Sequence, residues 1–149
     1  ARLLRLKKLV VVAHGLERLP DSLFENARLT FLKVECRYLQ ELPESISQLS
    51  SLATLNLSHC HDLTALPEST GQLPSLTALT LSGCGRLVAL PESTGQLSSL
   101  ATLSLSRCYF LAALPESIGQ LPSLATLSLP GCESLAALLE STSQLSSLA

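Results

Sequence analysis

A cysteine recurs every 24 residues along this chain, and that spacing constrains the fold more than any other feature of the sequence. The five cysteines are Cys36, Cys60, Cys84, Cys108 and Cys132. Around them a 24-residue unit repeats almost unchanged, for example LATLNLSHCHDLTALPESTGQLPS from residue 52 and LTALTLSGCGRLVALPESTGQLSS from residue 76. Self-similarity at a fixed period of this length is typical of a solenoid, in which each unit stacks on the one before it.

The two halves of each unit predict two kinds of local structure. Around Leu55 and Leu57, apolar and small polar residues alternate at period two, which predicts a short strand with one buried face. The L-P-E-S segment at 66–69 predicts a single helical or 3-10 turn, because proline fixes φ and needs no N–H donor at a helix start. We expect Gly71 to permit the turn back toward the next strand. A unit this short has too little interior to bury its leucines alone, so the core must be shared between neighbours.

The repeating pattern L-x-x-L-x-L-x-x-C-x-x-L-x-x-L-P-E-S-x-G-Q-L resembles the leucine-rich repeat, and the resemblance extends from Leu6 over nearly the whole chain. With cysteine at the turn, the units look like plant-type intracellular repeats, especially those of nucleotide-binding immune receptors. Similar units occur in Ras-group repeat proteins and bacterial effectors. The resemblance implies an α/β solenoid of about six repeats of 23–24 residues, with a curved parallel sheet on the concave side. Short 3-10 or helical turns and loops would form the convex side.

In that receptor family the domain recognises pathogen effectors and holds the nucleotide-binding switch off by contacting it. The resemblance therefore implies ligand recognition, autoinhibition or both, in the cytoplasm or nucleus. We expect residues 1–149 to be one domain and a fragment of a longer protein, because Ala1 falls inside an apolar periodic run. Neither end has the polar cap that shields terminal leucines in repeat arrays, so we also expect self-association through the uncapped repeat ends.

Charge is unevenly distributed along the sequence. Residues 1–37 hold eight basic and four acidic side chains, whereas residues 38–149 hold two basic and eight acidic side chains. The basic front could steer an acidic partner, or it could be an ordinary solvated surface. The basic residues are not interleaved with aromatic residues, so we expect no nucleic-acid partner. No run of about eighteen apolar residues occurs, so we expect no membrane partner.

The cysteine column is predicted to be structural. Each thiol stands at a strand-end turn, where it can pack as a small apolar group and donate a weak hydrogen bond. Five inward-pointing cysteines do not pair, and reduced thiols indicate a cytosolic or nuclear protein. A metal site at His59, Cys60 and His61 is the alternative, but adjacent residues point in different directions and the spacing is not that of a tetrahedral site. We expect no metal.

Catalysis is not indicated by any motif in the sequence. The patterns G-x-x-x-x-G-K-[ST], G-x-S-x-G and H-E-x-x-H are absent, so we expect no enzyme activity, no cofactor and no small-molecule substrate. One glutamate per unit recurs in P-E-S, and we place these glutamates in a first helical turn, where negative charge suits free N–H groups. They are Glu44, Glu68, Glu92 and Glu116.

Protein binding remains, and differences between the repeats predict where it occurs. Outward strand positions in the later units are small and polar, without the aromatic and arginine anchors that dominate binding energy. The positions flanking each cysteine vary instead, and they supply the candidates Arg37, Tyr38, His59, His61, Arg86, Arg107, Tyr109 and Phe110. The last three are the strongest cluster, unless the two aromatic rings fold over their own turn and cover core. A second candidate strip lies at Phe31, Lys33 and Glu35, where outward strand positions become large and charged.

Three functions are compatible with these observations. A recognition module of an immune receptor predicts a nucleotide-binding P-loop upstream in the full protein. A scaffold or spacer array predicts that Arg107, Tyr109 and Phe110 can be replaced without loss of a partner. A substrate-selecting part of a larger effector enzyme predicts a catalytic domain outside residues 1–149.

Overall fold

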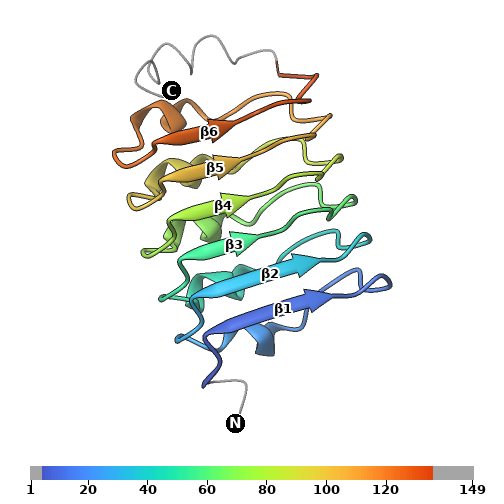
Figure 1. The fold of residues 1–149 in the computed structure, drawn as a ribbon, viewed down its shortest axis with the longest axis vertical. Helices are drawn as coiled ribbons and strands as arrows, with labels where there is room; N and C mark the ends of the chain where they lie inside the picture. The colour runs from blue at the N-terminus through green and yellow to red at the C-terminus, as the bar shows by residue number, and fades with distance from the viewer. Residues whose placement is uncertain (1–4, 136–149) are drawn as a thin grey trace.

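The computed structural model describes residues 5–135, and within them one strand from each repeat joins a single parallel sheet. Each strand pairs with the next one in the sequence, as Figure 1 shows by the stacked arrows that all point the same way. The strands are β1 (Lys8–Val12), β2 (Phe31–Glu35), β3 (Thr54–Asn56), β4 (Ala78–Thr80), β5 (Thr102–Ser104) and β6 (Thr126–Ser128).

The strand register follows the sequence period. Lys8 pairs with Phe31 and Phe31 with Thr54, a step of 23 residues, whereas Thr54 pairs with Ala78, a step of 24. One leucine from each strand therefore stacks on the equivalent leucine of its neighbours, such as Leu55 on Leu79. The predicted solenoid of 23–24-residue repeats is confirmed.

The opposite side of the sheet carries a 3-10 turn in each of the described connections between strands, behind the sheet in Figure 1. Each turn begins directly after a proline, as predicted. The third residue of a turn donates its backbone N–H to that proline's carbonyl, for example Thr70 to Pro67 at 3.0 Å. The turns are η2 (Asp21–Phe24), η3 (Glu44–Gln48), η4 (Glu68–Gln72), η5 (Glu92–Gln96) and η6 (Glu116–Gln120).

The core lies between the sheet and the turns, and both contribute to it. Strand leucines such as Leu55, Leu79 and Leu103 are completely buried, and so is Ile118 from η6. Because neighbouring repeats cover each other's leucines, no repeat has a core of its own. This is the shared interior expected from the sequence.

The explanation given above for Gly71 was wrong. Gly71 lies inside η4 without the positive φ that would require glycine. A Cβ atom at Gly71 would instead overlap the backbone and side chain of Ser93 in the next turn. Glycine is needed here because adjacent turns approach too closely for any side chain, and Gly95 meets Ser117 in the same way.

The repeated P-E-S triplet connects neighbouring turns. Glu44 and Glu68 lie in first helical turns, as expected, but their Oε2 atoms accept hydrogen bonds from the next repeat. The backbone N–H of Ser69 donates to Glu44 at 3.1 Å, and that of Ser93 donates to Glu68 at 3.4 Å. The Ser93 hydroxyl also donates to the Glu68 carbonyl oxygen at 2.6 Å. The glutamate therefore helps to join repeats as well as to begin a turn.

The cysteine column points into the core, as predicted, and all five thiols are free. The Sγ atom of Cys84 donates to the carbonyl oxygen of Leu57 at 3.1 Å, and that of Cys108 donates to Leu81 at 3.1 Å. Burial is the main cause that raises the pKa of Cys60 to about 11 and that of Cys108 to about 12. These thiols stay protonated near neutral pH, which suits a donor in a packed interior.

The ends of the chain, on which the self-association prediction depends, fall at residues 1–4 and 136–149, outside the described residues. Between residues 5 and 135, no helix has the length and apolar character needed to cross a membrane.

Candidate partner-binding surface

The residue before the cysteine adopts a left-handed backbone conformation in four successive repeats. The φ angles are 62° for His59, 79° for Gly83, 59° for Arg107 and 77° for Gly131. Glycine adopts this conformation freely, whereas for other residues it has a free-energy cost of about 1–2 kcal/mol. His59 and Arg107 are therefore held in a turn that suits glycine better. Backbone hydrogen bonds to the next repeat fix both positions, because His59 donates to Ser82 at 2.9 Å and Arg107 to Pro130 at 2.8 Å.

Large and small residues alternate along this left-handed column. A Cβ atom added to Gly83 would lie 3.0 Å from Nδ1 of His59. A Cβ atom added to Gly131 would lie 3.4 Å from Cγ of Arg107. Each glycine therefore leaves room for the side chain one repeat earlier.

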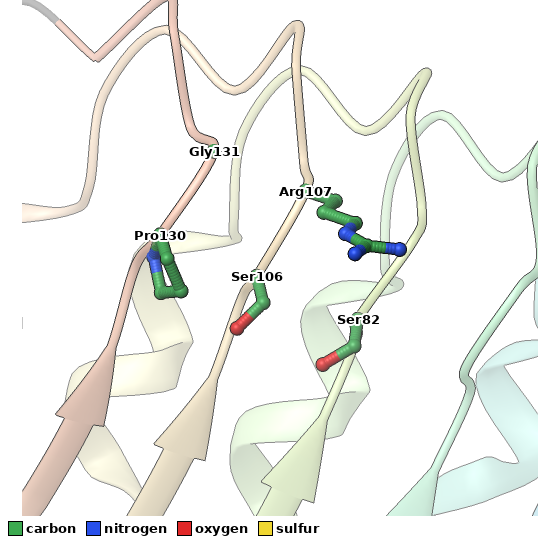
Figure 2. A pocket seen from close by; sticks show the side chains of 5 residues that line it. All are labelled: Ser82, Ser106, Arg107, Pro130 and Gly131. Carbon is green, nitrogen blue, oxygen red and sulfur yellow. The ribbon is translucent and has the colours of Figure 1, made fainter.

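Arg107 stands at the edge of a hollow of about 470 Å³ on the solvent side of the strand ends. Figure 2 shows that the Arg107 side chain leaves the backbone next to Ser106 and extends toward the preceding repeat, which carries Ser82. The lining residues are Ser82, Ser106, Arg107, Pro130 and Gly131. No ion pair involves Arg107 among the residues that the structure describes.

The residues after each cysteine form a second column, along the loop edge of the solenoid. Backbone N–H groups join it from repeat to repeat, from Asp62 to Arg37 at 3.1 Å, from Arg86 to His61 at 3.3 Å and from Phe110 to Gly85 at 3.3 Å. We call four exposed side chains of this column the aromatic edge. Its members are Tyr38, Arg86, Tyr109 and Phe110.

The aromatic rings of this edge face solvent. Tyr109 is 45% exposed and Phe110 is 63% exposed, so the alternative in which they fold over their turn to cover core is wrong. The Tyr109 ring lies beside Gly85, where a Cβ atom would be 3.5 Å from the ring. Tyr38 is 45% exposed in an earlier repeat, with the Arg37 guanidinium 5.7 Å from its ring centroid. Large apolar surface is thus available at both ends of the column.

Three further candidates of this region have neighbours within the chain. Arg86 forms an ion pair with Asp62, with 3.6 Å between Nη1 and Oδ1, and both belong to the column of residues that follow the cysteines. The rings of His59 and His61 lie 6.0 Å apart between centroids, and both residues are exposed. Cys60 does not join them, because its Sγ atom is buried and directed at the Val34 carbonyl oxygen 3.5 Å away. Across residues 5–135, no set of three or more potential ligands is arranged to hold a metal ion.

The strip at β2 differs from the cluster around Cys108. Lys33 Nζ lies 3.2 Å from Glu35 Oε2, so these two side chains neutralise each other. Lys8 Nζ lies 4.8 Å above the Phe31 ring. The strip lies on the sheet face, and Lys33 and Glu35 are paired with each other there.

The structure divides the strongest predicted cluster in two. Tyr109 and Phe110 belong to the loop edge, whereas Arg107 lies on the strand side of Cys108 beside the hollow. Sequence reasoning missed Ser82 and Ser106, because small polar strand positions carry no anchor by themselves. One available signal was Pro130, which interrupts the serine column formed by Ser58, Ser82 and Ser106.

Comparison with known families agrees with this geometry. Residues 5–84 match a family model described as R13L1/DRL21 LRRs, and residues 99–121 match the general Leucine Rich Repeat model. A search of curated protein sequences found no significant match.

Solved structures with the same fold include the leucine-rich repeat domain of the type III effector XopL. It is 34% identical with a TM-score of 0.76, over 90% of this chain and 47% of that chain. An internalin from Listeria monocytogenes is 15% identical with a TM-score of 0.57, over 97% of this chain and 46% of that one. The Arabidopsis receptor kinase HAESA was solved with the peptide hormone IDA and the co-receptor SERK1. It is 22% identical with a TM-score of 0.51, over 86% of this chain and 31% of that chain. The chain thus spans about half the length of the first two structures, and the last two show the fold alone.

Proposed function

The chain belongs to the R13L1/DRL21 family of leucine-rich repeats, and on that basis we propose that it is a protein-protein interaction module that binds its partner along the aromatic edge. The observation that carries this proposal is the exposure of Tyr109 and Phe110 next to each other on a backbone fixed by hydrogen bonds from repeat to repeat. Aromatic and arginine side chains supply most of the binding energy at protein interfaces. Rings held on a rigid loop also lose little conformational freedom on binding.

The finer proposal is recognition, autoinhibition or both in a plant-type disease-resistance receptor. The match to R13L1/DRL21 repeats over residues 5–84 supports this assignment. Free, buried thiols fit the cytoplasm or nucleus, where such receptors of innate immunity would act. In this proposal the module performs no catalysis and takes no cofactor, and its role is to position a protein partner.

A second candidate is the substrate-selecting part of a larger effector enzyme. The similarity to the XopL repeat domain, at 34% identity and a TM-score of 0.76, favours it. In that case the aromatic edge would bind a substrate protein, and the catalytic domain would lie elsewhere in the full protein.

The sequence of the parent transcript upstream of residue 1 distinguishes these two functions. A G-x-x-x-x-G-K-[ST] motif within a nucleotide-binding domain would make the repeats the sensor of a switch. A complete upstream frame without that domain would overturn the receptor proposal, and a catalytic domain in the full protein would support the effector enzyme.

The aromatic edge itself is tested in the full protein by the double variant Tyr109→Ser/Phe110→Ser. The matched control is Val12→Ser/Leu16→Ser, which also replaces two exposed apolar side chains, 55% and 41% exposed, but in the first repeat. We expect a partner that crosslinks to the wild-type protein to be lost from the edge variant and kept by the control. The affinity of the purified partner for all three proteins then completes the test. Equal affinity for all three proteins would show that the partner does not bind the aromatic edge, and would favour a scaffold or spacer array.

A further inference from the structure

We propose that the hollow beside Arg107 is a carboxylate-binding subsite that takes an acidic side chain of a bound polypeptide. The nature of the ligand, a polypeptide, rests on the proposed function. The chemistry of the subsite rests on the five residues that line the hollow and on the backbone that holds Arg107 there.

Arg107 lies between two glycines in the left-handed column. Gly83 and Gly131 occupy the same turn position in the adjacent repeats with the same left-handed backbone, so the turn itself gains nothing from an arginine. A non-glycine residue kept in a left-handed backbone conformation that disfavours side chains indicates a role beyond packing. Gly131 also leaves room for Arg107, because a Cβ atom at Gly131 would lie 3.4 Å from Cγ of Arg107.

The guanidinium charge of Arg107 has no ion-pair partner among the described residues. Residues 38–149 contain two basic side chains, Arg86 and Arg107. Arg86 already has Asp62 as a partner, whereas the structure between residues 5 and 135 provides none for Arg107. None of the residues that line the hollow is acidic. A guanidinium presents parallel N–H donors that match the two oxygens of a carboxylate, so a carboxylate is the best chemical complement.

Two serines that line the hollow can donate further hydrogen bonds. The Ser82 hydroxyl lies 3.1 Å from that of Ser104, and the Ser106 hydroxyl lies 3.3 Å from that of Ser128. Each pair has two O–H donors and uses one of them for its own hydrogen bond. When Ser82 and Ser106 accept within their pairs, their O–H groups remain free to donate to a carboxylate oxygen. Pro130 also lines the hollow, and its apolar ring suits the methylene group of an aspartate or glutamate.

The test uses three acetylated peptides of otherwise identical small polar sequence. The first has one internal aspartate and an amidated end, the second has asparagine in its place, and the third has asparagine and a free carboxyl terminus. Each is titrated into isotopically labelled protein while the resonances of Ser82, Ser106 and Arg107 are followed. The proteins compared are the wild type, Arg107→Gly and Arg86→Gln. Arg107→Gly installs the residue of the flanking repeats and should fold normally, and Arg86→Gln removes the same charge one repeat away.

We expect the aspartate peptide to bind the wild type and to shift these three resonances, with asparagine weakening binding. Arg107→Gly should lower the affinity for the aspartate peptide by about tenfold, which is the loss typical of a charge-assisted hydrogen bond. Arg86→Gln should change this affinity little. Equal binding of the aspartate and asparagine peptides, no binding of either, or equal binding by Arg107→Gly and wild type would each overturn the proposal. Binding of the free-terminus peptide alone would overturn the side-chain assignment in favour of a chain end.

A separate variant keeps this test independent of the aromatic edge. Tyr109→Ser/Phe110→Ser leaves every lining residue of the hollow unchanged, so it should bind the aspartate peptide as the wild type does. If the partner experiment fails while the peptide titration succeeds, partner binding at the aromatic edge is refuted and the carboxylate subsite is not.

Discussion

The thiol of Cys84 donates a hydrogen bond to the carbonyl oxygen of Leu57, with 3.1 Å between Sγ and O. Both residues are completely buried. The acceptor lies in the preceding repeat, 27 residues earlier in the chain. A thiol is a weak donor, but here it serves a backbone carbonyl that water does not reach.

Replacing Cys84 by alanine should lower the free energy of unfolding by about 1–3 kcal/mol, because the Leu57 carbonyl loses its donor and a small void remains. Chemical denaturation followed by circular dichroism measures the change. Cys132→Ala is the matched control, since Cys132 makes the same kind of bond to Leu105 but is only partly buried. A loss for Cys84→Ala no larger than that for Cys132→Ala would contradict the argument from burial.

The cysteine column also predicts a fall in stability at alkaline pH. Burial raises the pKa of Cys60 from an ordinary value of 9.0 to about 11 in the folded state. Above pH 9 the unfolded chain therefore releases this proton while the folded chain keeps it, so the free energy of unfolding decreases as pH rises from 9 toward 11. Denaturation midpoints at pH 8, 9, 10 and 11 test this, and Cys60→Ala should show a shallower decline than the wild type. Parallel curves for the two proteins would show that this thiol is not involved.

Thr94 should be replaceable by valine with a gain in stability. Its Oγ1 atom is buried without a hydrogen-bond partner among the described residues, and Ile118 fills the equivalent place one repeat later. Removing an unsatisfied buried hydroxyl should raise the free energy of unfolding by about 1 kcal/mol. Thr102→Val on the solvent side of β5 serves as the control and should have a smaller effect. A lower denaturation midpoint for Thr94→Val would indicate that its hydroxyl has a partner after all.

Gly71→Ala should destabilise the array. Its Cβ atom would overlap Ser93, so the two turns would have to separate at a cost of about 1–3 kcal/mol. Gly15→Ala introduces the same atom where nothing lies within 4 Å, and should be nearly neutral. Thermal unfolding of the two variants compares them directly. Equal melting temperatures would show that the turns have room to spare.

Arg107→Gly should stabilise the protein by about 1 kcal/mol through relief of the left-handed backbone. The control Arg86→Gly changes a residue without a positive φ and should give no such gain. Denaturant titration of both variants, beside the peptide titration above, separates the folding effect from the binding effect. A glycine variant that is less stable than the wild type would show that the Arg107 side chain has a structural role.

Much of the fold could be predicted from the sequence because its determinants are local and repeated. The alternation around Leu55 predicts the strand, Pro67 predicts the start of η4, and the position of Cys60 after the strand predicts a thiol that faces the core. Each of these depends on the chemistry of one residue and its near neighbours. The 23–24-residue period then fixes which elements stack.

The features that were missed depend on distances between repeats. The need for glycine at position 71 comes from Ser93 in another turn, and no local propensity reports that approach. The hollow arises because Ser82, Ser106 and Pro130 come from three consecutive repeats. The left-handed conformation of Arg107 was also hidden, although the glycines at positions 83 and 131 were visible evidence of it.

The thiol hydrogen bond to the preceding repeat, made by Cys60, Cys84, Cys108 and Cys132, also bears on how such a chain changes length. Removal of residues 61–84 would delete the carbonyl that Cys108 uses, that of Leu81, but would bring Leu57 to the same place. Loss or duplication of whole 24-residue units therefore leaves no thiol without an acceptor, wherever the break falls among the near-identical repeats. Unequal recombination within the gene could therefore lengthen or shorten the array by whole repeats while these buried thiols keep a backbone acceptor.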